Sequence, residues 1–155
     1  MSLYAKRKTT DAIVVHCTAT PEGREYTARD IDQMHRQRGF TGIGYHYIVK
    51  LDGTVEPGRP VDTIGAHVQG HNATTVALSY VGGVDAKGKA KDTRTPAQKA
   101  AMLHLIGQLR ARYPGARVLG HRDFSPDTNG NGRVDPGERI KDCPCFDAIP
   151  EYAVG

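Results

Sequence analysis

The 155-residue sequence has no long apolar run, no even set of cysteines and no dense cluster of basic residues. A membrane-spanning helix needs about 20 consecutive apolar residues, and no segment approaches that length. The three cysteines are an odd count, which does not suit the disulfide framework of a small secreted domain. The basic residues near the start are not followed by an apolar segment, so we expect no signal peptide. We therefore expect synthesis in the cytoplasm, without membrane insertion.

Tryptophan is absent, but 38% hydrophobic and 25% charged residues are typical of a globular protein. The length suits one domain with its own core. The net charge of +4 suits an anionic partner such as a bacterial wall polymer or nucleic acid. However, the basic residues are scattered, and neither helix-turn-helix nor zinc-finger spacing is present, so we expect no nucleic-acid binding. A monomer is the default expectation.

The hydrophobic pattern predicts a single α/β domain, with a central mixed β-sheet flanked by helices. A polar lead-in over 1–10 precedes it. The helix over 95–115 has the clearest signals, because Thr95 suits an N-cap and Pro96 the first helical position. The predicted elements are a strand ending near His16, a helix over 27–39, a hairpin over 44–60 with an Asp-Gly turn, a strand over 73–83, the helix over 95–115 and a strand over 116–121.

Two histidines, His16 and His121, lie where predicted buried strands end. A single histidine in such a place is more often a packed core residue. Two histidines and a thiol, however, form a known catalytic zinc ligand set, with a fourth position left for water. Both Cys143 and Cys145 could supply the thiol, and their spacing alone leaves the choice open. Cys17 directly follows His16 on its strand, so we expect it to point away into the core.

Several motifs lie in a fixed order along nearly the whole chain, from Asp11 to Asp147. They are DAIVVHCTAT, GIGYHYIVKLDGTVEPGRP, YVGGVDAKGK, TPAQ, LGHRD and KDCPCFD. Together they resemble the zinc-dependent N-acetylmuramoyl-L-alanine amidases of the bacteriophage lysozyme type, whose superfamily includes the animal peptidoglycan recognition proteins. The resemblance implies that residues 11–155 form the catalytic domain of this family, with the fold that its members share. It also implies cleavage of the amide between N-acetylmuramic acid and L-alanine in peptidoglycan, by a phage or prophage endolysin that reaches the cell wall after release.

The resemblance also assigns residues. It places the Zn²⁺ ligands on His16, His121 and Cys143, and the catalytic tyrosine and lysine on Tyr45 and Lys141. On an extended chain, residues two apart face the same side, so Lys141 and Cys143 can point at one metal. Recognition proteins that bind muropeptide without cutting are expected to lack the cysteine, so its presence favours an enzyme. An unrelated zinc hydrolase acting on another amide fits the near full-length match poorly.

The stretch TIGAHVQGHN falls where the family lines its substrate groove. His67 and Asn72 are therefore candidates for contacts with the muropeptide. A structured polar loop would explain these two residues equally well.

The segment 124–140 departs from the family pattern, in which the stretch between the second histidine and the Lys-x-Cys motif is usually short. It fits a 12-residue calcium loop, with oxygen ligands at positions 1, 3, 5, 9 and 12, glycine at 6 and a backbone carbonyl at 7. Asn-Gly and Asp-Pro pairs also form turns without metal, and no long helix flanks the loop. The calcium ligands would be Asp127, Asn129, Asn131, Arg133 through its carbonyl, Asp135 and Glu138.

Overall fold

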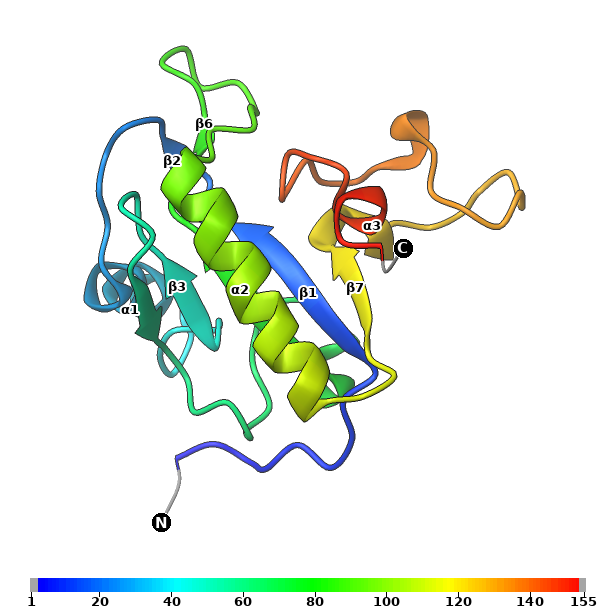
Figure 1. The fold of residues 1–155 in the computed structure, drawn as a ribbon, viewed down its shortest axis with the longest axis horizontal. Helices are drawn as coiled ribbons and strands as arrows, with labels where there is room; N and C mark the ends of the chain where they lie inside the picture. The colour runs from blue at the N-terminus through cyan, green and yellow to red at the C-terminus, as the bar shows by residue number, and fades with distance from the viewer. Residues whose placement is uncertain (1–2, 154–155) are drawn as a thin grey trace.

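A five-stranded mixed sheet forms the centre of the computed structural model, which describes residues 3–153 (Figure 1). The strand order is β4-β3-β5-β1-β7. Four strands run parallel, and β4 is antiparallel to β3, as expected for the mixed sheet. The strands are β1 (Ala12–Cys17), β3 (Tyr47–Val49), β4 (Val55–Pro57), β5 (Thr75–Tyr80) and β7 (Arg117–Gly120).

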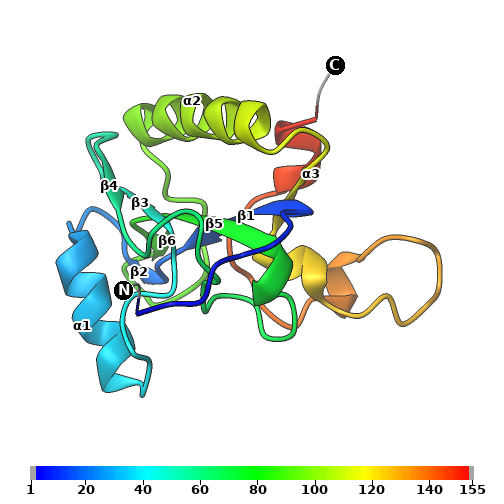
Figure 2. The same ribbon diagram turned by 90° about the horizontal axis from the view of Figure 1, so that it is seen from below.

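Two helices cover opposite faces of this sheet (Figure 2). Helix α2 (Pro96–Arg112) buries an apolar stripe against one face, and α1 (Ala28–Gln37) packs Ile31 against the other. The predicted N-cap of α2 is confirmed, because the Thr95 hydroxyl accepts a hydrogen bond from the Gln98 N–H at 3.0 Å. The buried stripe of α2 consists of Met102, Leu105, Ile106 and Leu109.

Strand β1 is buried on both faces, as a central parallel strand should be. Alternate side chains point in opposite directions. Ile13, Val15 and Cys17 join the core cluster beneath α2, so Cys17 lies in the core as expected. Val14 belongs to a separate cluster on the other face, and His16 lies on the same side as Val14. The sheet therefore presents His16 on the face away from α2.

Several short elements were not predicted from the sequence. Strands β2 (Thr20–Pro21) and β6 (Gly83–Val84) form a two-stranded parallel sheet, and α3 (Ala148–Glu151) packs near β7. Within the described part of the chain, no helix is long and apolar enough to cross a membrane. Short 3-10 turns occur at η1 (Asn72–Thr74), η2 (His121–Phe124) and η3 (Pro136–Glu138).

Candidate metal centre and substrate cleft

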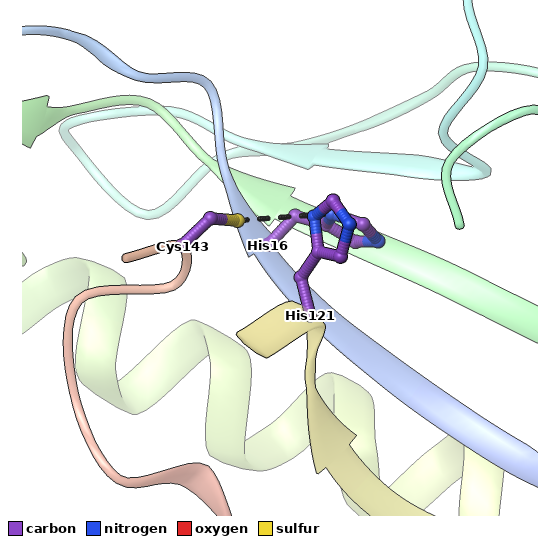
Figure 3. A group of neighbouring side chains, drawn as sticks. All are labelled: His16, His121 and Cys143. Carbon is purple, nitrogen blue, oxygen red and sulfur yellow. Dashed lines mark hydrogen bonds between the residues drawn. The ribbon is translucent and has the colours of Figure 1, made fainter. Parts of the chain in front are cut away.

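Three side chains from distant parts of the sequence converge at one end of the sheet (Figure 3). His16 comes from β1, His121 from the turn that follows β7, and Cys143 from the C-terminal segment. Their ligand atoms all lie within 4.8 Å of one another. The Cys143 Sγ lies 3.8 Å from the His16 Nδ1, and the two imidazole centroids are 4.6 Å apart. Among residues 3–153, no other group of three or more His, Cys, Asp or Glu side chains brings its ligand atoms as close together.

Backbone groups hold the Cys143 thiol in place. The Cys17 N–H points at the Cys143 Sγ from 3.2 Å, and the Arg122 N–H donates to the Cys143 carbonyl at 2.8 Å. The thiolate is the form of cysteine that binds metal, and the backbone contacts hold the sulfur beside His16. The residues next to the two histidines therefore also position the thiol.

Two side chains of the His121-Arg122-Asp123 motif stabilise the turn that carries His121. The Asp123 carboxylate accepts a hydrogen bond from the Gly120 N–H at 2.7 Å, which fixes the start of the turn. The nearly buried Arg122 guanidinium reaches the other way and pairs with Asp147 Oδ1 at 2.6 Å. This pair ties the segment that carries Cys143 to the end of β7.

Cys145, whose role the spacing left open, faces a different environment. Its Sγ lies 3.9 Å from the Cys17 Sγ and 3.4 Å from the Gly83 carbonyl oxygen. The contact with the Cys17 thiol, together with burial, raises the pKa of Cys145. The geometry thus separates the two thiols and groups only Cys143 with the histidines.

Both histidines of the group favour the neutral form. Burial lowers the pKa of His16 well below its usual value, and neighbouring His67 and His121 lower it further. Burial, and to a lesser extent the Lys141 charge, lowers the pKa of His121 to about 4. A neutral imidazole is the form that binds a metal ion.

The donor set fits a zinc ion. Two imidazole nitrogens and a thiolate are ligands that zinc prefers, and three protein ligands leave one position open. Tetrahedral zinc with ordinary bond lengths holds a sulfur and a nitrogen ligand about 3.6 Å apart. The 3.8 Å between the Cys143 Sγ and the His16 Nδ1 is close to that separation.

A cleft of about 910 Å³ opens over this group. Tyr45 lines it, with its ring centroid 5.0 Å from that of His16. Burial, and then the nearby Cys143 thiol, raises the pKa of Tyr45, so its phenol keeps its proton at neutral pH. Lys141 is exposed at the rim, and His67 and Asn72 line another part of the wall.

Comparison with known proteins decides the family. The family model for N-acetylmuramoyl-L-alanine amidase matches residues 6–138. The chain belongs to this amidase family. The amidase is 40% identical over 144 residues to an endolysin of Klebsiella phage KP32, covering 93% of this chain and 86% of the relative.

Solved structures agree on the fold of the amidase. The N-acetylmuramoyl-L-alanine amidase LysC from Clostridium intestinale URNW superposes with a TM-score of 0.72 at 26% identity, covering 97% of this chain and 85% of that one. Drosophila PGRP-LB superposes with a TM-score of 0.70 at 22% identity, covering 99% and 84% of the two chains, and so shares the fold. The family resemblance, which rests on the motifs, and the α/β fold class, which the hydrophobic pattern predicted, are thus both confirmed.

The two candidate substrate residues also have contacts within the amidase itself. The Asn72 side-chain oxygen accepts hydrogen bonds from the backbone N–H groups of His67 and Val68, at 2.8 and 2.9 Å. His67 Nδ1 lies 2.9 Å from the His16 Nε2, and His67 Nε2 lies 3.0 Å from the Thr75 hydroxyl. Sequence reasoning missed the His67–His16 contact, because no periodic signal links residues 51 positions apart.

The inserted segment 124–140 projects from the body of the amidase beyond β7 (Figures 1 and 2). Its acidic side chains bind the segment's own backbone. Asp127 accepts from the Gly130 and Gly132 N–H groups, at 2.9 and 2.8 Å. Glu138 accepts from the Thr128 N–H and, at 3.1 Å, from the Asp135 N–H. Calcium binding by this loop stays a prediction.

Proposed function

We propose that the amidase is a zinc-dependent peptidoglycan hydrolase that cleaves the amide between the lactyl group of N-acetylmuramic acid and L-alanine. The observation that carries the proposal is the convergence of His16, His121 and Cys143 beneath an open cleft. These residues would hold the ion. A bound zinc ion supplies Lewis acidity, which activates water and polarises a carbonyl group.

Cys143 sets the charge of the centre. As a thiolate it contributes one negative charge, whereas the two neutral histidines contribute none. The centre then keeps a single net positive charge toward the substrate. A further cation close by would help to stabilise the oxyanion that forms when the amide carbonyl is attacked.

Lys141 supplies that cation. Its charge acts at the site already, since it lowers the pKa values of both His121 and His16. Lys141 sits at the mouth of the cleft, two residues before Cys143, so it can approach a scissile carbonyl without being buried. Its role in the proposal is electrostatic stabilisation of the tetrahedral oxyanion.

Tyr45 acts as a hydrogen-bond donor in this scheme. Because the raised pKa keeps the phenol protonated, its O–H can donate to the oxyanion or orient the attacking water. The ring packs beside His16 and lines the cleft. Proton transfer to the leaving amine could use the same hydroxyl.

The biological role that we propose is that of an endolysin. A relative at 40% identity, from Klebsiella phage KP32, carries that name. The amidase would act as a monomer on the cell wall after its release from the cytoplasm. The alternative is a recognition module that holds muropeptide without cutting, since Drosophila PGRP-LB has the same fold. The Cys143 thiol, placed with both histidines, favours cutting.

We further propose that the inserted segment binds Ca²⁺ and that the bound ion orders the segment so that Lys141 and Cys143 are held at the zinc site. The calcium ligands would be Asp127, Asn129, Asn131, Arg133, Asp135 and Glu138. The support is the match of the segment to a calcium loop. Titration calorimetry on metal-stripped protein tests this proposal, with Glu138→Gln as the matched variant. A calcium heat that is lost in the variant supports it. No heat at millimolar calcium rejects it.

Digestion of purified peptidoglycan tests the hydrolase. Products would be identified by mass spectrometry with the native enzyme, after treatment with a zinc chelator, and after zinc is added back. Free stem peptides that begin with L-alanine should appear, disappear with the chelator and return with zinc. Uncut peptidoglycan that still binds the protein would instead establish a recognition module.

A further inference from the structure

A chain of hydrogen bonds runs from His16 into the wall of the cleft. We infer that His67 is a positioning residue that fixes the tautomer and orientation of His16, through a relay that ends at the His71 backbone carbonyl. The inference rests on the proposed zinc site. The relay consists of His16 Nε2 to His67 Nδ1 at 2.9 Å, His67 Nε2 to Thr75 Oγ1 at 3.0 Å, and Thr75 Oγ1 to the His71 oxygen at 2.9 Å.

The last acceptor sets the direction of the whole relay. A carbonyl oxygen can only accept, so the single hydroxyl hydrogen of Thr75 must point at His71. The Thr75 oxygen is then free only to accept, and the proton between it and the ring must lie on His67 Nε2. A neutral imidazole carries one proton, so His67 Nδ1 has a lone pair.

The protonation of His67 in turn sets that of His16. Because His67 Nδ1 accepts, the proton in the next bond belongs to His16 Nε2. The neutral His16 ring then has its lone pair on Nδ1, the atom that lies 3.8 Å from the Cys143 Sγ. The reverse direction would place the proton on that atom and block it as a ligand. The relay therefore selects the tautomer that binds metal.

The surroundings hold the relay rigidly. Thr75 begins β5 and pairs with Ala12 at the start of β1, the strand that carries His16. The His67 backbone is tied to Asn72, and Gly65 leaves room for the ring, since a Cβ there would come within 2.8 Å of His67 Cδ2. The relay ends on a neutral carbonyl rather than a carboxylate. It thus orients His16 without adding negative charge to the centre.

Two matched pairs of variants test this role. His67→Leu removes the acceptor, whereas His67→Asn can place an oxygen near the position of Nδ1. Thr75→Val removes the hydroxyl, whereas Thr75→Ser keeps it. Zinc affinity would be measured by competition with a chromophoric chelator. The visible spectrum of the cobalt-substituted protein would report the geometry of the centre.

We expect His67→Leu to weaken zinc binding about 10–100-fold and to change the cobalt spectrum, as loss of a ligand's outer partner does. His67→Asn should restore most of the affinity. Thr75→Val should lose less zinc affinity than His67→Leu does. Thr75→Ser should keep the wild-type affinity. If His67→Leu does not fold, the Thr75 pair decides the question.

Two outcomes overturn the inference. One is wild-type zinc affinity in folded His67→Leu or, where that variant does not fold, in Thr75→Val. The other is a raised KM for muropeptide with unchanged zinc affinity, which would make His67 a substrate contact. A failure of the proposed zinc function itself looks different, because the wild-type protein would then bind no zinc in the same competition.

Discussion

The His16 Nδ1 lies 3.8 Å from the Cys143 Sγ, although the two residues are 127 positions apart in the sequence. The Cys17 N–H, which follows His16 on β1, points at the same sulfur from 3.2 Å. Strand β1 thus contributes a ligand atom and also a hydrogen bond that stabilises the second ligand. Cys145 has no such contacts with the histidines, and its sulfur pairs with Cys17 instead.

This relationship predicts opposite results for two similar substitutions. Cys143→Ser should weaken zinc affinity by more than the ~10–100-fold that is typical when a ligand's hydrogen-bond partner is removed, because it removes the ligand itself. Amidase activity should be lost with the metal. Cys145→Ser should keep both. Zinc content by atomic emission, together with peptidoglycan digestion, measures the two effects. Loss of zinc from Cys145→Ser with retention by Cys143→Ser would reverse the assignment.

Tyr45→Phe should lower kcat by about 100-fold and leave zinc content unchanged. The substitution keeps the ring that packs beside His16 but removes the hydroxyl that donates to the oxyanion or water. Steady-state hydrolysis of a soluble muropeptide gives kcat, and metal analysis of the same sample serves as the control. Near-normal turnover in the variant would exclude a chemical role for the hydroxyl.

Lys141→Ala should lower kcat on the order of 10–100-fold, since an exposed charge near the oxyanion stabilises it less than a buried donor would. Lys141→Arg should recover part of the rate because it keeps the charge. The loss should be greater at low ionic strength, where a surface charge is less screened. Equal rates for the wild type and Lys141→Ala across the salt range would show that the lysine charge plays no part.

The sequence predicted the main elements because their signals are local. The Thr95 cap and the buried stripe of α2 lie within one helix, and the central strand β1 is an apolar run. The pairing of β2 with β6 could not be predicted, because each strand has only two residues and the pairing depends on long-range contacts. Helix α3 is a single turn with no comparable pattern.

The grouping of the site residues was predictable only in part. Strand ends pointed to His16 and His121, whereas the choice between the two thiols depends on backbone conformation. The Cys145 N–H bonds to the Asp142 carbonyl at 2.7 Å, and Cys145 has a φ of +72°, so the chain turns here. Alternation along an extended chain therefore does not apply after Cys143. The path of the loop that brings His67 to His16 has no local signal at all.

His46 makes the stability of the fold depend on pH. It is 1% exposed, its Nε2–H donates to the Thr63 carbonyl at 2.8 Å, and its Nδ1 accepts from the Ala77 N–H at 3.0 Å. Both nitrogens are thus satisfied only in the neutral ring. Burial lowers the pKa of His46 to about 4, compared with the ordinary histidine value of 6.5.

The sign of the effect follows from proton binding. Between pH 6.5 and 4 the unfolded chain binds a proton at His46 that the folded protein does not, so the free energy of unfolding falls as the pH falls. This contribution is fully present above pH 6.5, decreases by about 3 kcal/mol on the way to pH 4 and then levels off.

The variant His46→Gln should lack this pH-dependent contribution to the free energy of unfolding. Urea unfolding of the wild type and the variant at several pH values measures the difference. That difference should be greatest near pH 7.5 and shrink toward pH 4. A constant difference would mean that His46 titrates alike in both states. The histidines of the metal centre contribute equally to both proteins, so they cancel in the comparison.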